Sequence, residues 1–213
     1  MTDPGQSRFD GRFEFASTIL LALAAVASAW AVYQGATWRG EQARAGSKSI
    51  AARVESTRAA NVMNRQTQID VALFTQWVDA YARDETELAT FYRRRFRPEF
   101  RPAFVAWIAT EPRTNPRAPL SPFAMPEYEL AASATSERLE AAAATFSRRA
   151  GAYIQRADDY ALASVLFAVS LFFAGISTRL QARAPRSVVL ALGYALFLST
   201  VVWLMTFPVN LPV

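Results

Sequence analysis

The sequence contains no cysteine and no histidine among its 213 residues. Without thiolate or imidazole side chains, the chain offers no zinc-finger or thiolate metal site, no disulfide framework and no axial histidine for haem. It also lacks a Cys nucleophile and a Ser–His pair, which excludes the most familiar hydrolase and redox chemistries. The sequence therefore predicts a protein that is not an enzyme, with no catalytic residue, no cofactor and no metal.

Charged residues are also scarce, at 19% against roughly 25% in an ordinary soluble domain. Residues 15–38, 160–178 and 187–213 form charge-free runs of 24, 19 and 27 residues, and no other run exceeds 9. A hydrocarbon core about 30 Å thick needs ~20 apolar residues in a helix, and a charge at its centre costs at least ~2.5 kcal/mol. We therefore expect three transmembrane helices, at residues 15–35, 160–178 and 187–207.

The first apolar run has a second interpretation, as the core of a signal peptide. Arg8 and Arg12 precede it, and Ala27-Ser28-Ala29 resembles a cleavage site. The run continues through Trp30–Tyr33, however, which makes it longer than a signal core of roughly 7–15 residues. A membrane helix is therefore the favoured interpretation.

The loop at residues 179–186 carries three arginines and no acidic residue. Short positively charged loops stay in the cytoplasm, whereas long loops are exempt from this charge count. The rule predicts a cytoplasmic N-terminus at residues 1–14. It places residues 36–159 and the tail at 208–213 outside the cytoplasm.

Prolines divide the long region at residues 36–159. Seven of the 11 prolines lie within residues 98–126, and no glycine occurs in residues 47–150. Because proline interrupts helices, we expect long helices on both sides of a proline-rich tip, with the second beginning near Pro126. The two arms have about 37 and 34 residues and so similar lengths at ~1.5 Å per residue. The fold class predicted is an all-α integral membrane protein with a helical hairpin between spans 1 and 2.

Within the tip, residues 99–110 place Phe100, Phe104 and Trp107 at helical spacing. The pattern predicts a short amphipathic helix whose apolar face is buried against the hairpin, a neighbouring subunit or a partner. The residues that follow, 111–121, contain three prolines and predict an extended linker.

A basic run interleaved with aromatic residues precedes this helix. Guanidinium groups bind carboxylates and other anions bidentately, so this run favours contact with an anionic group or a partner. Alternatively, the arginines pair with nearby acidic residues around a packed tip. The predicted contact residues are Arg93, Arg94, Arg95, Arg97, Phe100, Phe104 and Trp107. Residues 36–159 contain 18 basic and 15 acidic residues, a balance that argues against nucleic-acid binding.

Residues 53–70 form a segment that is polar almost all round, with Asn61, Asn64 and Gln68 among its amides. Such a helix lines a water-filled vestibule in an oligomer, sets register through buried amides, or is simply solvated with one narrow seam. After it, four apolar residues share one helix face: Val71, Phe74, Val78 and Tyr81.

Small residues recur every four positions in the first span, at Ala27, Ala31 and Gly35. This spacing allows helices to approach closely within a membrane, either between copies of the chain or against its own other spans. No ionisable side chain lies inside the three spans, which disfavours ion-coupled transport.

Four stretches resemble a group of three-span bacterial inner-membrane proteins: Trp30–Gln34, Arg97–Trp107, Asn115–Tyr128 and Phe172–Ser177. The resemblance covers nearly the whole chain. It implies a multi-pass protein of the bacterial inner (plasma) membrane, with one span before the extramembrane region and two after it. It implies no activity and no binding residue.

The function that we expect is a non-enzymatic inner-membrane scaffold or accessory subunit. Its hairpin would make protein–protein contacts in a homo-oligomer or a larger membrane complex, with the lipid bilayer as its other partner. The alternative is a homo-oligomeric passive channel whose vestibule is lined by Asn61, Asn64 and Gln68.

Overall fold

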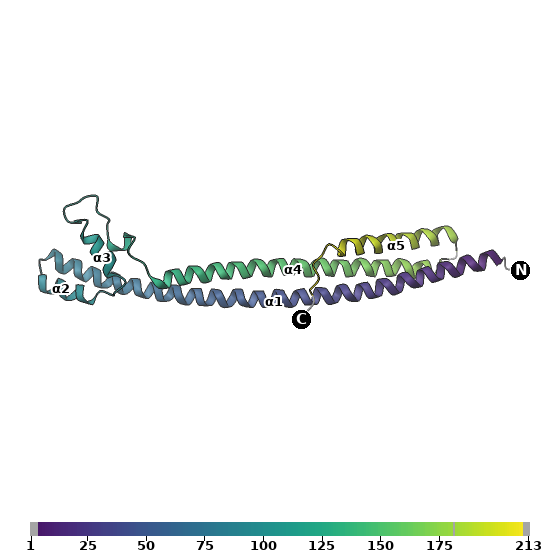
Figure 1. The fold of residues 1–213 in the computed structure, drawn as a ribbon, viewed down its shortest axis with the longest axis horizontal. Coiled ribbons are helices and arrows are strands. Elements are labelled where there is room, and N and C mark those ends of the chain that lie inside the picture. The colour runs from purple at the N-terminus through teal and green to yellow at the C-terminus, as the bar shows by residue number, and fades with distance from the viewer. Residues whose placement is uncertain (1–3, 181, 211–213) are drawn as a thin grey trace. The chain divides into compact units, whose positions relative to one another are not determined.

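The computed structural model describes residues 4–180 and 182–210 (Figure 1). Within these ranges every regular element is helical: α1 (Pro4–Ala82), α2 (Thr86–Arg95), α3 (Arg101–Ile108), the short 3-10 helix η1 (Pro122–Ala124), α4 (Ala131–Ser177) and α5 (Arg183–Leu204). The predicted all-α class is confirmed. Parts of the predicted termini and basic loop lie outside the described residues, namely residues 1–3, Gln181 and residues 211–213, as do the side chains of Arg8 and Arg12.

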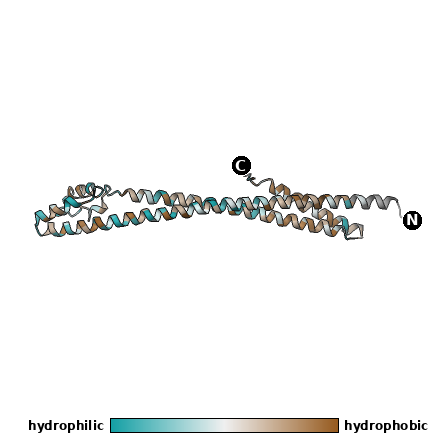
Figure 2. Cartoon of the chain, turned by 90° about the horizontal axis from the view of Figure 1, so that it is seen from below, coloured by the Kyte–Doolittle hydropathy of each residue, from teal (hydrophilic) through white to brown (hydrophobic). Residues whose placement is uncertain are grey.

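Three helices are long and apolar enough to cross a membrane. The segments are Phe13–Ala82, Ala131–Ser177 and Ala184–Leu204. Figure 2 shows the apolar residues gathered in α5, in the early part of α1 and in the later part of α4. Large apolar side chains on these segments are more than half exposed, as lipid-facing residues are: Phe15, Val26, Val165, Phe172, Val188 and Val202. The three helices are therefore consistent with a multi-pass membrane protein.

The chain divides into two compact units. The first, here called the apolar unit, comprises Met1–Ser47 and Phe146–Val213, and the second, the aromatic unit, comprises Lys48–Thr145. The long helices α1 and α4 each contribute a segment to both. Each unit closes around a hydrophobic core of its own.

Small residues bring α1 close to α4 in the apolar unit. Ala31 and Ala157 are fully buried, and a Cβ atom added at Gly35 would lie 3.4 Å from the carbonyl oxygen of Ala157. The stripe of small residues predicted in the first span therefore packs against the chain's own helices. Lipid tails are as apolar as the helices, so the hydrophobic effect does not drive helices together within a membrane. Their association depends instead on close van der Waals packing, which small residues allow.

Hydroxyl groups tie the helices of the apolar unit together. Ser17 and Ser177 are fully buried, with 3.1 Å between their Oγ atoms. The hydroxyl of Tyr194 in α5 donates a hydrogen bond of 2.8 Å to the carbonyl of Ala16 in α1. Buried polar groups need such partners, since each unpaired group costs about 1–3 kcal/mol.

Serine residues join α1 and α4 in the aromatic unit. Ser49 Oγ donates to the carbonyl of Ala143 at 2.9 Å, and the Oγ atoms of Ser56 and Ser136 lie 3.1 Å apart. The contacts are seven residues apart on each helix and run in opposite directions along the chain. These segments of α1 and α4 are therefore antiparallel within the unit.

The region between α1 and α4 differs in part from the prediction. The short amphipathic helix is confirmed as α3. Residues 111–121 form a series of turns and not the extended linker that the prolines predict, because backbone hydrogen bonds such as that from Asn115 to the carbonyl of Glu111 close them. Helix α2 has no counterpart in the sequence prediction. The returning helix begins at Ala131, not near Pro126, because Tyr128 is turned towards Phe100 and Asp70 in the core.

The close approach at Gly193 of α5 generates a testable prediction. A Cβ atom there would lie 3.1 Å from Cδ2 of Leu20 and 3.2 Å from Cβ of Phe173. We expect Gly193→Leu to destabilise the apolar unit by about 1–3 kcal/mol or more, because a packed interface resists added volume. Unfolding in detergent micelles measures this. Gly175→Leu is the matched control, since nothing lies within 4 Å of a Cβ atom at Gly175; equal losses in both variants would contradict the prediction.

Candidate functional site

The core of the aromatic unit contains the three rings predicted at helical spacing, of which Phe100 directly precedes α3 and the other two lie within it. Phe100, Phe104 and Trp107 are 0%, 3% and 8% exposed. Phe104 meets Trp77 of α1 edge to face at 4.8 Å between ring centres, and Trp107 meets Phe74 in the same way at 5.3 Å. Because the chain's own side chains cover these rings, the rings support the surface that surrounds the core. Their contact with a partner stays a prediction.

A buried carboxylate, Asp70 of α1, lies beside this core. The side chain is 0% exposed, and its Oδ2 accepts hydrogen bonds from Nη1 of Arg97 at 3.0 Å and from the hydroxyl of Tyr128 at 3.1 Å. Arg97 also pairs with Glu99 at 3.0 Å. The network joins α1, the turn after α2 and the turn before α4. Its one signal in the sequence is spacing: Asp70 lies seven residues before Trp77, on the same helix face.

Burial raises the pKa of Asp70 above its ordinary value, because loss of hydration disfavours the carboxylate more than Arg97 and Tyr128 stabilise it. Its Oδ1 has no hydrogen-bond partner in the part of the chain that the structure describes. Burial likewise raises the pKa of Tyr128, so the phenol stays protonated and remains a donor. We call Asp70, Arg97 and Tyr128 together the clamp, because their hydrogen bonds tie two turns to α1.

The four arginines of the predicted contact site fall into two groups. Arg97 belongs to the clamp, with only 17% of its side chain exposed. Arg93, Arg94 and Arg95 are exposed and form no ion pair with any described residue. The guanidinium of Arg93 lies 6.0 Å from the ring centre of Phe104. Of these four arginines, Arg97 alone pairs with acidic residues within the described ranges, which is the alternative that the sequence offered for the whole run.

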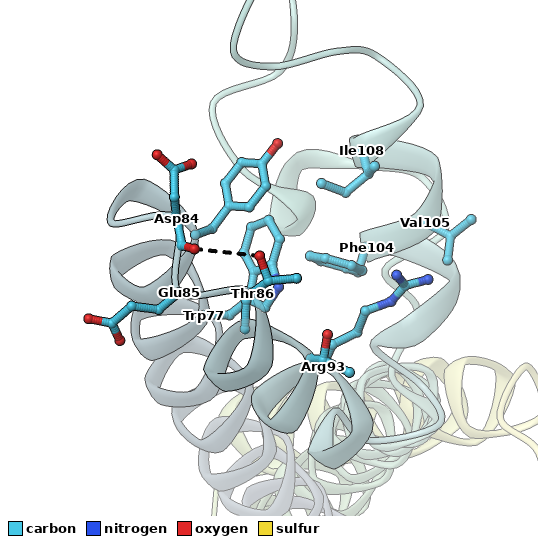
Figure 3. A pocket seen from close by; sticks show the side chains of 11 residues that line it. Trp77, Asp84, Glu85, Thr86, Arg93, Phe104, Val105 and Ile108 are labelled. Carbon is cyan, nitrogen blue, oxygen red and sulfur yellow. Dashed lines mark hydrogen bonds between the residues drawn. The ribbon is translucent and has the colours of Figure 1, made fainter.

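A cavity of about 320 Å³ opens where α1, α2 and α3 meet (Figure 3). Trp77 and Phe104 form an aromatic surface within it. Figure 3 shows Arg93 extending towards Phe104, whereas the carboxylates of Asp84 and Glu85 point outward. The remaining lining residues are Tyr81, Thr86, Ala89, Thr90, Val105 and Ile108. The sequence did not predict this cavity, because α2 forms one of its walls.

The predicted vestibule residues Asn61, Asn64 and Gln68 all lie exposed on one face of α1. They belong to a longer row, spaced alternately by four and three residues, in which every member is exposed. The row consists of Ile50, Val54, Thr57, Asn61, Asn64, Gln68, Val71, Thr75 and Val78. We call it the exposed row; its ends are aliphatic and its centre carries amides.

No group of three or more Asp or Glu side chains within the described ranges is arranged to hold a metal ion. The chain has no significant match to a protein-family model, to a curated protein or to a solved structure. Its function therefore has to be inferred from the exposed row, the clamp and the cavity.

The clamp predicts a large effect of removing its cation. Arg97→Met leaves the carboxylate of Asp70 buried without its ion-pair partner, which typically costs about 3–5 kcal/mol. We expect a fall of that order in the free energy of unfolding of the full-length protein, followed by tryptophan fluorescence. Arg65→Met, which removes an exposed arginine of α1 in the same unit, should change it by less than about 0.5 kcal/mol. Similar values for the two variants would rule out a stabilising clamp.

The pKa of Asp70 predicts an unusual dependence of stability on pH. Because this pKa is higher in the folded than in the unfolded chain, the folded state binds the proton more tightly. The stability contributed by protonation is fully present below the unfolded pKa of 3.8 and is lost as the pH rises through the folded pKa. Wild type should therefore gain stability relative to Asp70→Asn as the pH falls from neutrality towards about 4. Arg97, Glu99 and Tyr128, which surround Asp70, are present in both proteins, so their own titration cancels in the comparison. A difference in unfolding free energy between the two proteins that stays constant with pH would contradict the prediction.

Proposed function

We propose that the chain is a non-enzymatic membrane scaffold that associates with further copies of itself through the exposed row of α1. The aliphatic ends of the row support this most directly, because exposed apolar residues at alternating steps of four and three residues form the seam of a coiled coil. Ile50 and Val54 at one end are 66% and 46% exposed in the single chain. Pairing with an identical row would remove these side chains from water.

The proposed topology places the aromatic unit outside the cytoplasm of a bacterium, on the inner membrane. The basic loop before α5 supports a cytoplasmic position for that loop and for the N-terminus. The antiparallel segments that meet at Ser49 and Ser56 would then form a helical hairpin inserted between the first and second spans. Because a membrane inserts every copy in the same direction, identical rows would meet in parallel.

The amides at the centre of the row would select the assembly. In parallel coiled coils, an Asn in the seam specifies register and subunit number at some cost in stability. Asn64 of one copy would face Asn64 of the next, flanked by Asn61 and Gln68. The aliphatic ends would supply the association, while the tip with Arg93, Arg94 and Arg95 stays available to other members of a membrane complex.

The same amides support a second candidate, a homo-oligomeric passive channel. Four or more copies around one axis would surround a hydrated passage lined by Asn61, Asn64 and Gln68, whereas a scaffold would close the seam by apolar packing. Conductance across a planar bilayer distinguishes the two.

The absence of native cysteine allows a direct test by cross-linking. Asn64→Cys and Val71→Cys lie seven residues apart in the exposed row, so identical thiols should face each other across the seam. We expect disulfide-linked dimers from both variants after mild oxidation of membranes, seen on non-reducing gels. Val62→Cys is the matched control, because Val62 is exposed on α1 but lies about 160° around the helix from Asn64.

Equal cross-linking of all three variants, or of none, would argue against the seam. Native mass spectrometry of the wild type in lipid nanodiscs provides an independent check. A defined multimer is expected, and a monomer would refute self-association.

A further inference from the structure

A second hollow adjoins the cavity between α1, α2 and α3. It measures about 360 Å³ and shares four lining residues with the first: Thr90, Arg93, Phe104 and Val105. The two hollows adjoin at these residues, along α2 and α3, and together we call them the α2–α3 groove. It lies within the aromatic unit and is separate from the exposed row.

The floor of the groove is aromatic and held in place by ring contacts. Trp77 is 5% exposed and meets Phe104 at 4.8 Å between ring centres. Tyr81 stacks on Trp77 at 4.7 Å with 16° between the ring planes. Val105, which is 57% exposed, lies at the mouth. Burial of a ring or short alkyl chain on such a surface is favourable because it removes apolar area from water.

The wall of the groove carries cations without carboxylate partners. Arg93, Arg94 and Arg101 line the second hollow, and none of them forms an ion pair within the described ranges. Nε and Nη2 of Arg101 donate to the carbonyls of Phe96 at 2.9 Å and Arg94 at 3.2 Å. These bonds hold the guanidinium in place but leave its charge uncompensated.

We propose that the α2–α3 groove binds a small apolar carboxylate. Its ring or alkyl chain lies against Trp77 and Phe104, and its carboxylate is held by Arg93 and the neighbouring arginines. A cavity of about 320 Å³ is at the lower end of the range of roughly 300–1,000 Å³ for ligand sites, which suits one ring with a short chain. An organic cation fits less well, because Arg93 would repel it and the carboxylates of Asp84 and Glu85 point away from the cavity.

Two probes that differ only in charge test the proposal. Full-length protein in phosphatidylcholine nanodiscs is titrated calorimetrically with 4-phenylbutyrate and with its neutral amide, 4-phenylbutyramide. The carboxylate should bind at least about tenfold more tightly than the amide, because hydrogen bonds from guanidinium groups to an ionised acceptor are stronger than those to a neutral one. Equal affinities, or binding of neither probe, overturn the proposal.

Variants then locate the site. Arg93→Gln combined with Arg94→Gln should weaken carboxylate binding by about tenfold or more and leave amide binding unchanged, since both side chains are exposed and the fold does not depend on them. Val105→Trp should block the mouth to both probes. Arg65→Gln, on α1 of the same unit, is the control and should bind like wild type. Wild-type affinity in the double arginine variant overturns the assignment.

A free acid and the C-terminal residue of a polypeptide present the same chemistry, so a third pair of probes separates them. These are N-acetyl-Gly-Phe and its C-terminal amide. Binding of the peptide acid alongside phenylbutyrate indicates a polypeptide terminus, and binding of phenylbutyrate alone indicates a free acid. Both results retain the apolar carboxylate, whereas equal binding of the peptide acid and its amide contradicts it.

Discussion

Close contact between α1 and α4 at small side chains is the constraint on which both units depend. In the apolar unit Gly35 and Ala157 bring the two backbones together, and in the aromatic unit Ser49 and Ser56 do so. Helices that meet in this way leave little room for bulky residues between them. The large rings of the aromatic unit therefore gather where α3 and η1 cover α1, and the cavity forms at the edge of that cluster.

The clamp holds the turns around this cluster. Burying Asp70 carries a desolvation cost, and Arg97 and Tyr128 offset only part of it, which is why the pKa of the carboxyl group is raised. In return, two turns without regular structure are tied to a rigid helix. The walls of the α2–α3 groove are thus fixed by contacts made inside the aromatic unit, and a ligand would meet a surface that is already formed.

The spans and α3 could be predicted from sequence because their signals are local: long charge-free runs, and apolar residues at helical spacing. Helix α2 could not, since Ala89 is its one buried residue and its larger apolar side chains, Leu88 and Phe91, remain 40% and 45% exposed. The start of α4 depends on Tyr128, whose partners lie far away in the sequence. The sequence places Val71, Phe74, Val78 and Tyr81 on one helix face, but of these only Phe74 packs into the core cluster of the aromatic unit. Apolar residues occupy neighbouring faces of α1, so their spacing alone does not indicate which face is buried. The burial of Asp70 could not be predicted from hydropathy, because carboxylates are normally placed on the exposed face of a helix.

The inward row and the exposed row of α1 are offset by a single residue. Ser49, Asp70 and Trp77 face the core, and Ile50, Val71 and Val78 follow them directly on the outside. Deleting one residue from this stretch would turn everything beyond it by about 100°, which would bring the exposed row to the inner face and carry the inward row away from it. The helix can therefore keep both surfaces only when its length changes by close to a whole number of turns, as with about seven residues. Each such change has to be matched in α4, so that the lengths of the two helices are inherited together.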